Sequence, residues 1–258
     1  MQPQVATPHR SRGHPVRAGL RRSQRLRDRE SEANQQLCHN LVGLANAYFW
    51  AGEADRAEEY LDEALELATA YEFQRLLATC NSTRGAIERE RGQLETAISH
   101  QREALELVEQ LDDEFIQQWQ AIGLAQTLVR AGEADEALGL AREARQQLPE
   151  GYPHTAVMSE AIYGAALLET GDPEAARESL ESALEGSRGL SNAARIISLR
   201  ELGRLEWREG ETETARDRLE TGRTLAIETG HRIYVPQFDE LIAEVDGARS
   251  PIGNGDTG

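Results

Sequence analysis

Three arginines at successive four-residue steps are the side chains of this sequence best placed to bind an anion. Arg200, Arg204 and Arg208 fall on one face of a predicted helix, with Trp207 beside them, in a chain of formal net charge -17. Because like charges at this spacing repel by about 0.2–0.5 kcal/mol per pair, the row costs free energy locally. It is therefore a candidate site for a partner's carboxylates or a phosphate, with Trp207 as an apolar platform. The alternative is a solvated row that acidic side chains of the same or neighbouring helices neutralise.

An amide and two aromatic rings form a second candidate site. Asn46, Phe49 and Trp50 are spaced so that they share one face of a predicted helix. Together they can form an aromatic pocket for part of a ligand. The alternative is that the rings pack between helices, which is the commoner fate of aromatic side chains.

The sequence lacks the patterns that catalysis and metal binding require. Its six histidines are scattered, with no HExxH motif and no pair four residues apart, and no GxSxG motif occurs. The chain has no lysine, which excludes a Walker-type phosphate loop and a Schiff base. We therefore expect a protein that is not an enzyme and that uses no metal or other cofactor.

Cysteine usage and hydropathy bear on the cellular compartment. Cys38 and Cys80 are the only cysteines, and they have neither a CxxC spacing nor a preceding secretory signal. The longest nearly apolar run, from Ala161 to Leu168, is too short to cross a bilayer. We expect a cytoplasmic protein that does not enter a membrane.

Charge divides the chain into an arm and a body. Residues 1–34 hold eight arginines and three acidic residues, which leaves 20 basic and 42 acidic residues for the remainder. The arm, with three prolines and no sustained periodicity, is predicted to be disordered, as is the Gly-rich tail at residues 249–258. The acidic body at residues 35–248 disfavours nucleic acid and anionic membranes and favours a basic partner.

The elements that position the candidate sites follow from an internal repeat. Turn glycines recur at spacings of 40, 40, 39 and 39 residues, each followed five residues later by alanine. A small residue also stands seven residues before and twelve residues after each glycine. The glycines are Gly52, Gly92, Gly132, Gly171 and Gly210.

This repeat predicts five antiparallel helix pairs. Glycine ends the first helix of each pair, and the small residues let the two helices approach closely where they cross. After the fifth pair, Pro236 opens a last helix whose apolar face, with Phe238 and Val245, is expected to cap the stack. The second pair is the weakest, because Arg84, Glu88 and Gln101 stand where the other pairs are mostly apolar.

The repeat resembles the tetratricopeptide repeat family. Its signature is reproduced in the first pair by Leu44-Ala45, Tyr48, Gly52, Ala57, Leu61 and Ala64. The resemblance implies an all-α fold, a right-handed superhelical solenoid of five hairpins and a capping helix. The spacing of 39–40 residues is similar to the long-repeat variant of the family rather than to its usual 34 residues.

The resemblance also implies a binding scaffold whose first helices line a concave groove for a protein or peptide. In that arrangement Asn46 is similar to the groove asparagine with which family members hold peptides. The alternative function is a ligand- or peptide-sensing regulatory module of a bacterial transcription or signalling protein, and a homodimer through either end of the stack is left open. The expected partner-binding residues are Asn46, Phe49, Trp50, Trp119, Arg200, Arg204, Trp207 and Arg208.

Overall fold

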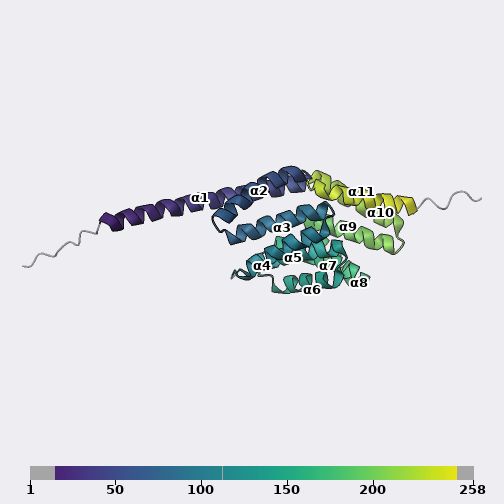
Figure 1. The fold of residues 1–258 in the computed structure, drawn as a ribbon. Helices are drawn as coiled ribbons and strands as arrows, with labels where there is room; N and C mark the ends of the chain where they lie inside the picture. The colour runs from purple at the N-terminus through teal and green to yellow at the C-terminus, as the bar shows by residue number, and fades with distance from the viewer. Residues whose placement is uncertain (1–14, 112, 249–258) are drawn as a thin grey trace, which may run out of the picture.

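The computed structural model describes residues 15–111 and 113–248, and their regular structure is entirely helical (Figure 1). The first three helix pairs are α1 (Pro15–Ala51) with α2 (Ala54–Ala70), α3 (Gln74–Glu90) with α4 (Leu94–Glu109), and α5 (Glu114–Ala131) with α6 (Ala134–Gln147). The last two are α7 (Pro153–Glu169) with α8 (Pro173–Gly186), and α9 (Asn192–Arg208) with α10 (Thr212–Glu228). A 3-10 turn, η1 (Arg232–Tyr234), and α11 (Val235–Ala248) follow.

The predicted turn glycines end the first helices. Gly132, which follows α5, has a φ of 79° in the left-handed region, and the N–H of Glu133 donates a 3.0 Å hydrogen bond to the carbonyl of Leu128. This arrangement satisfies carbonyls that the end of a helix leaves unpaired, and glycine adopts it without steric cost. The prediction of five hairpins is confirmed.

The small residues inside the pairs lie at close helix crossings. A Cβ atom on Gly164 would stand 2.7 Å from Cγ of Leu180, and one on Gly203 would stand 2.7 Å from Cγ of Leu219. These leucines therefore fill the space that the glycines leave. The repeated pattern of small and large residues sets the distance between the helices of each pair.

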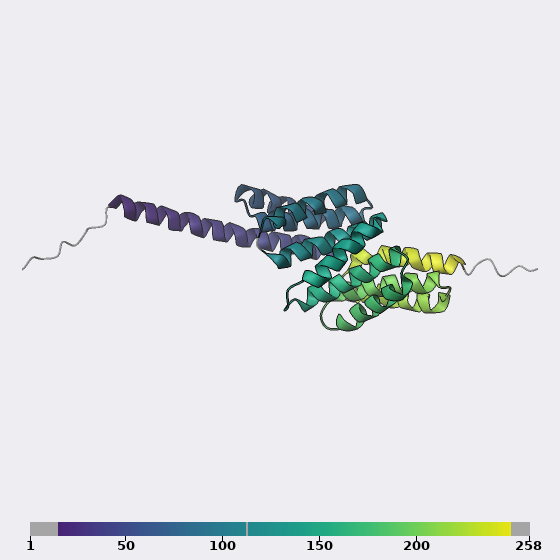
Figure 2. The ribbon, with the colours of Figure 1, turned by 90° about the horizontal axis from the view of Figure 1, so that it is seen from below.

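The first helices form the inner layer of the solenoid. Each of α1, α3, α5 and α7 packs on the first helix of the next pair as well as on its own partner, and α9 packs on α11. The second helices lie outside them, so the stack curves with the first helices on its concave side (Figure 2). No helix within residues 15–111 and 113–248 is long and apolar enough to cross a membrane.

The N-terminal arm differs from the sequence prediction. Residues 15–34, expected to be disordered, belong to α1, whose first turns project beyond the other helices (Figure 1). The segment is rich in residues that favour helices, and Gln24 donates a 2.9 Å hydrogen bond to Asp28 one turn ahead. Tyr71, at the end of α2, donates a 3.4 Å hydrogen bond to Glu30. Residues 1–14 and the predicted tail at 249–258 lie outside the described residues.

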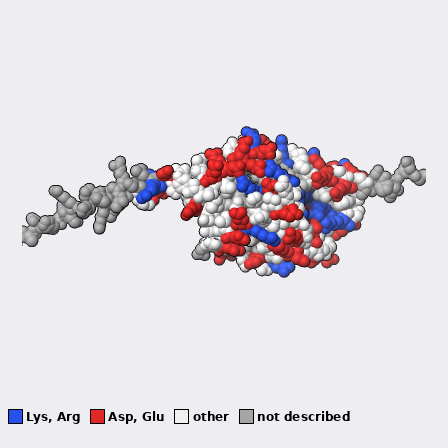
Figure 3. Space-filling model, viewed as in Figure 1, with Lys and Arg blue, Asp and Glu red and all other residues white. Residues whose placement is uncertain are grey.

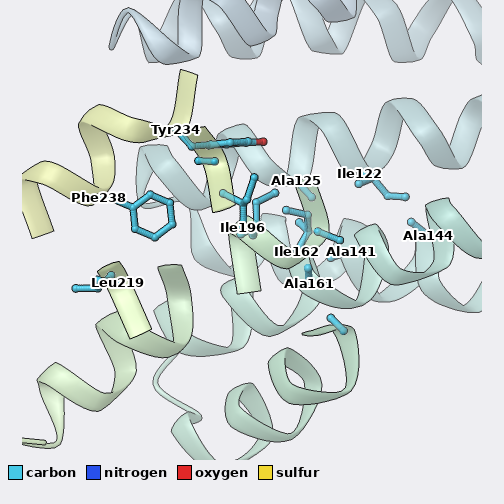
Figure 4. Close-up of a cluster of buried hydrophobic side chains, with 14 of the residues drawn as sticks. Ile122, Ala125, Ala141, Ala144, Ala161, Ile162, Ile196, Leu219, Tyr234 and Phe238 are labelled. Carbon is cyan, nitrogen blue, oxygen red and sulfur yellow. The ribbon is translucent and has the colours of Figure 1, made fainter. Parts of the chain in front are cut away.

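The C-terminal helix caps the fifth pair as predicted. Phe238 and Val245 of α11 are fully buried, and Figure 4 shows Phe238 near Leu219 at one end of the central apolar cluster. A Cβ atom on Gly222 would stand 2.5 Å from the ring of Phe238. The fifth pair therefore has glycine where the other pairs have alanine, because the ring of the cap needs that space.

The cap also reaches the first two pairs. The ring of Trp50, at the end of α1, lies 5.3 Å from that of His231 and 5.8 Å from that of Tyr234. Gln237 of α11 donates a 2.6 Å hydrogen bond to Glu90 of α3. The solenoid thus curves until its C-terminal end contacts its beginning across the concave side.

Candidate functional site

A cavity of about 260 Å³ lies on the concave side, between the first helices and η1. Its walls come from α1, α3, α5 and α7, with one residue of α4 and Tyr234 of η1. Four of the predicted site residues line it together: Asn46, Phe49, Trp50 and Trp119. Residues more than 180 positions apart in the chain therefore share one site.

Aromatic and aliphatic side chains make the cavity largely apolar. The rings of Phe49 and Trp50 meet edge to face at 4.9 Å, and the ring of Tyr234 lies 5.8 Å from that of Trp50. Ile122 is a further apolar wall residue. Trp119 leaves 39% of its surface exposed, so a large apolar side chain is accessible at the cavity. An incoming apolar group would cover it.

Most polar groups of the cavity already have partners. Asn46 accepts a 3.2 Å hydrogen bond from the hydroxyl of Thr83. Arg89 is buried and donates to Glu90 at 2.8 Å and to Gln126 at 3.2 Å. Burial raises the pKa of Glu90, but Arg89 and Arg130 lower it further, so the net pKa lies below its usual range and the carboxylate stays charged. The charge of Arg89 is thus neutralised beside the cavity.

Among the described lining residues, Gln101 and Tyr234 each keep a buried polar atom without a partner, and Gln101 is the one that belongs to the helix pairs. It comes from the second helix α4, is 1% exposed, and its Oε1 has no hydrogen-bond partner among the described residues. The equivalent positions of the other four repeats hold Leu61, Ala141, Leu180 and Leu219. The sequence marked this position as unusual for its repeat, but only the structure shows that the amide lines the cavity.

Two further lining residues, Met158 and Tyr234, were not among the predicted site residues. Met158 occupies the position of α7 equivalent to Trp119 of α5, so the repeat spacing alone was enough to find it. Tyr234 comes from η1, outside the five pairs, and nothing in the repeat pattern places it there. Figure 4 shows Tyr234 above the apolar cluster, with its hydroxyl directed away from Phe238.

Two members of the arginine row, Arg200 and Arg204, line a second hollow together with Arg130, Glu169 and Glu201. Glu201, which is 1% exposed, accepts hydrogen bonds from Arg200 at 2.7 Å and Arg204 at 2.6 Å. Although burial raises it, these two arginines bring the pKa of Glu201 down to about 2. Arg204 also pairs with Glu169 at 2.6 Å.

The remaining members of the row line neither hollow. Arg208 is 44% exposed at its side chain and lies 3.4 Å from Glu169. Trp207 is half-buried and packs against the central apolar cluster. Glu209 pairs with Arg177 rather than with the row. The geometry favours the second interpretation of the row, in which acids of the same and neighbouring helices neutralise it.

Metal and thiol chemistry find little support in the described part of the chain. Within residues 15–111 and 113–248, no group of three or more His, Cys, Asp or Glu is placed to hold a metal ion. Cys38 and Cys80 are free and buried. Burial raises the pKa of Cys80 to about 12, so its thiol stays protonated and unreactive.

Comparison with known proteins identifies the repeat. Residues 36–110, which span the first two pairs, match the tetratricopeptide repeat family. Among curated proteins, no match was found.

Solved structures resemble the whole stack. A Rap protein complexed with competence and sporulation factor has a TM-score of 0.63 at 17% identity, over 86% of this chain and 73% of the Rap chain. PilF of Pseudomonas aeruginosa has a TM-score of 0.52 at 18% identity, over 86% and 95% of the two chains. A putative kinesin light chain of Podosopora anserina with nearly identical TPR-like repeats has a TM-score of 0.51 at 18% identity, over 74% and 95%.

At these identities the neighbours bear on the fold alone. They share the superhelical stack of helix pairs found here, and the family match supplies the repeat signature independently. Residues 36–110 therefore match the tetratricopeptide repeat, and the five hairpins with their turn glycines continue the same superhelical fold over the rest of the described chain.

Proposed function

We propose that this protein is an interaction scaffold that binds a segment of a protein or peptide on its concave side. The observation that carries the proposal is the cavity, which the partly exposed Trp119 lines together with Phe49, Trp50 and Tyr234. Partly exposed aromatic anchors around an apolar hollow are typical of the residues that dominate binding energy in interfaces. Catalysis forms no part of the proposal.

The charge of the surface favours a basic partner. Acidic side chains are spread over the face shown in Figure 3, in keeping with the 42 acidic and 20 basic residues that follow position 34. Charge complementarity raises the association rate and selects partners more than it raises affinity. We therefore expect a segment that is apolar where it enters the cavity and basic where it crosses the rim, and we place the encounter in the cytoplasm.

A structural neighbour gives limited support. The Rap protein is described as complexed with competence and sporulation factor, so a superhelix of similar fold takes up a ligand. That property belongs to the Rap protein. It makes binding on this chain reasonable and does not identify the partner.

The test uses Trp119 and a matched control. Peptides selected from a displayed random library on the whole chain should bind wild type and lose at least tenfold affinity to Trp119→Ala in calorimetry, because the variant removes an apolar anchor. Ile227→Ala on α10 truncates an equally exposed apolar side chain outside the cavity and should bind like wild type. Equal affinity for Trp119→Ala and wild type would remove the groove assignment.

A second candidate function is a ligand-sensing regulatory module. It is favoured by the contact of η1 with the end of α1, because an occupant of the cavity touches both ends of the stack. Ligand bound there should hold the two ends of the stack together. The average radius of gyration measured by solution scattering should then decrease. A scattering profile that ligand leaves unchanged favours the scaffold.

A further inference from the structure

The position of Gln101 shows that a polar side chain has been built into an apolar site. A Cβ atom on Gly85 would stand 2.6 Å from Cγ of Gln101, just as one on Gly164 would stand 2.7 Å from Cγ of Leu180. The first carbons of Gln101 therefore lie where a leucine side chain lies in the equivalent pair. Beyond them the amide extends to the cavity wall, where a Cβ atom on Gly123 would meet its Nε2 at 3.7 Å.

Leucine would fit this position and would leave no polar atom unpaired. A buried amide oxygen that lacks a protein partner costs free energy of desolvation, a cost that leucine at this position would avoid. The hydroxyl of Tyr234 is likewise buried and lacks a hydrogen-bond partner among the described residues. It is buried at the cavity, and although Gln126 is a polar neighbour, no group of the described residues reaches hydrogen-bond geometry with it.

The two unpaired polar groups and the apolar walls together determine which chemical properties a ligand of this cavity needs. The ligand must carry a polar group small enough to enter among aromatic walls. It should be neutral, because Arg89, the charged residue among the described lining residues, is already paired with Glu90. A cavity of about 260 Å³ holds more than one benzene ring, for which an apolar cavity of about 150 Å³ is sufficient.

A hydroxyl group suits both unpaired positions. It donates to an amide oxygen, accepts from an amide NH2, and does either with the hydroxyl of Tyr234. The match therefore holds for either orientation of the Gln101 amide. An ammonium or carboxylate group would instead bring an uncompensated charge into an apolar site.

We propose that the cavity binds a neutral phenol ring, whose hydroxyl bonds to Gln101 and Tyr234 while its ring packs against Trp50, Trp119 and Phe49. The phenol is either a tyrosine side chain of the bound segment or a free phenolic compound. This inference rests on the proposed function, because both concern the same cavity. It adds the chemical group of the ligand that enters the cavity.

The experiment compares probes that differ by one oxygen. Binding of p-cresol and toluene, and of a short alanine-rich peptide with a central tyrosine or phenylalanine, is measured on the whole chain by calorimetry. Gln101→Leu removes the amide and restores the residue of the equivalent repeats. Gln120→Leu is the matched control, because Gln120 is also 1% exposed with both amide atoms unpaired, but it does not line the cavity.

Wild type and Gln120→Leu should bind the hydroxylated member of a pair at least tenfold more tightly, and Gln101→Leu should bind both members equally. Tyr234→Phe, which keeps a ring beside Trp50, should reduce the preference as well. If p-cresol binds more tightly than toluene, a free phenolic compound is enough to occupy the site. If only the tyrosine peptide binds more tightly than its phenylalanine counterpart, the site takes a tyrosine side chain of a bound segment.

Equal binding within both pairs on wild type, no binding of any probe, or a preference that survives in Gln101→Leu would overturn the proposal. These outcomes are separate from failure of the scaffold function. Library-selected peptides without tyrosine that lose affinity to Trp119→Ala would keep that function while the phenol site is rejected.

Discussion

The cavity and the arginine row were both expected to bind a partner, and they differ in how their polar groups are satisfied. In the row, Glu201 accepts hydrogen bonds from two arginines and Glu169 pairs with Arg204. In the cavity, the amide oxygen of Gln101 and the hydroxyl of Tyr234 have no partner among the described residues. Paired charges hold helices together, whereas unpaired polar groups leave interactions to be completed by something else. Residue type alone does not distinguish these two cases.

The largest effect is expected at the buried pair of the row. Glu201→Gln should lower the free energy of unfolding by about 3–5 kcal/mol, because it leaves Arg200, itself 6% exposed, without its counter-charge. Urea denaturation measures the change. Glu209→Gln, which affects an exposed pair with Arg177, should cost at most about 1 kcal/mol. Equal losses in the two variants would show that the row is not structural.

Acid should reveal the same pair in the wild-type protein. The pKa of Glu201 falls from 4.5 to about 2 in the folded state, so its contribution is fully present above pH 4.5 and is lost as the pH falls toward 2. At 1.36 kcal/mol per unit, the loss is about 3 kcal/mol. Denaturation at several pH values should show this decline in wild type and a weaker one in Glu201→Gln. If the stability of the two proteins declines in parallel as the pH falls, groups other than Glu201 cause the loss of stability in acid.

The cavity predicts a smaller effect of opposite sign. Gln101→Leu should raise the free energy of unfolding by about 1–2 kcal/mol, because it removes an unpaired buried amide from a position that leucine fits. Thermal and urea unfolding of the ligand-free protein measure this. A loss of stability in Gln101→Leu would mean that the amide is satisfied in the folded protein, and the contrast between the two regions would disappear.

The sequence was sufficient for the repeat and its consequences. Spacing of the turn glycines predicted the five pairs, and the apolar face around Phe238 predicted the cap. These features follow from contacts within a pair or between neighbours, which a periodic pattern records directly. The helical start of α1 at Pro15 is not predicted, because the basic charge and prolines of the arm indicate disorder whereas the helix propensity of residues 15–34 favours a helix.

The site was predictable only in part. Asn46, Phe49, Trp50 and Trp119 share the cavity because first helices line the concave side, which the family resemblance implies. The approach of Tyr234 to Trp50 depends on the curvature accumulated over five pairs, and no local pattern records that sum. Pairing in the row depends on whether Glu169 and Glu201 face the arginines, which likewise requires the packed structure.

One measurement tests the contrast most directly: the affinity of one library-selected peptide for wild type, Trp119→Ala and Arg208→Ala. Arg208 is the most exposed arginine of the row, with 44% of its side chain accessible, so its removal leaves the buried pair intact. The cavity account predicts at least a tenfold loss for Trp119→Ala and less than a twofold change for Arg208→Ala. A large loss for Arg208→Ala with Trp119→Ala unchanged would contradict it and return the binding site to the arginine row.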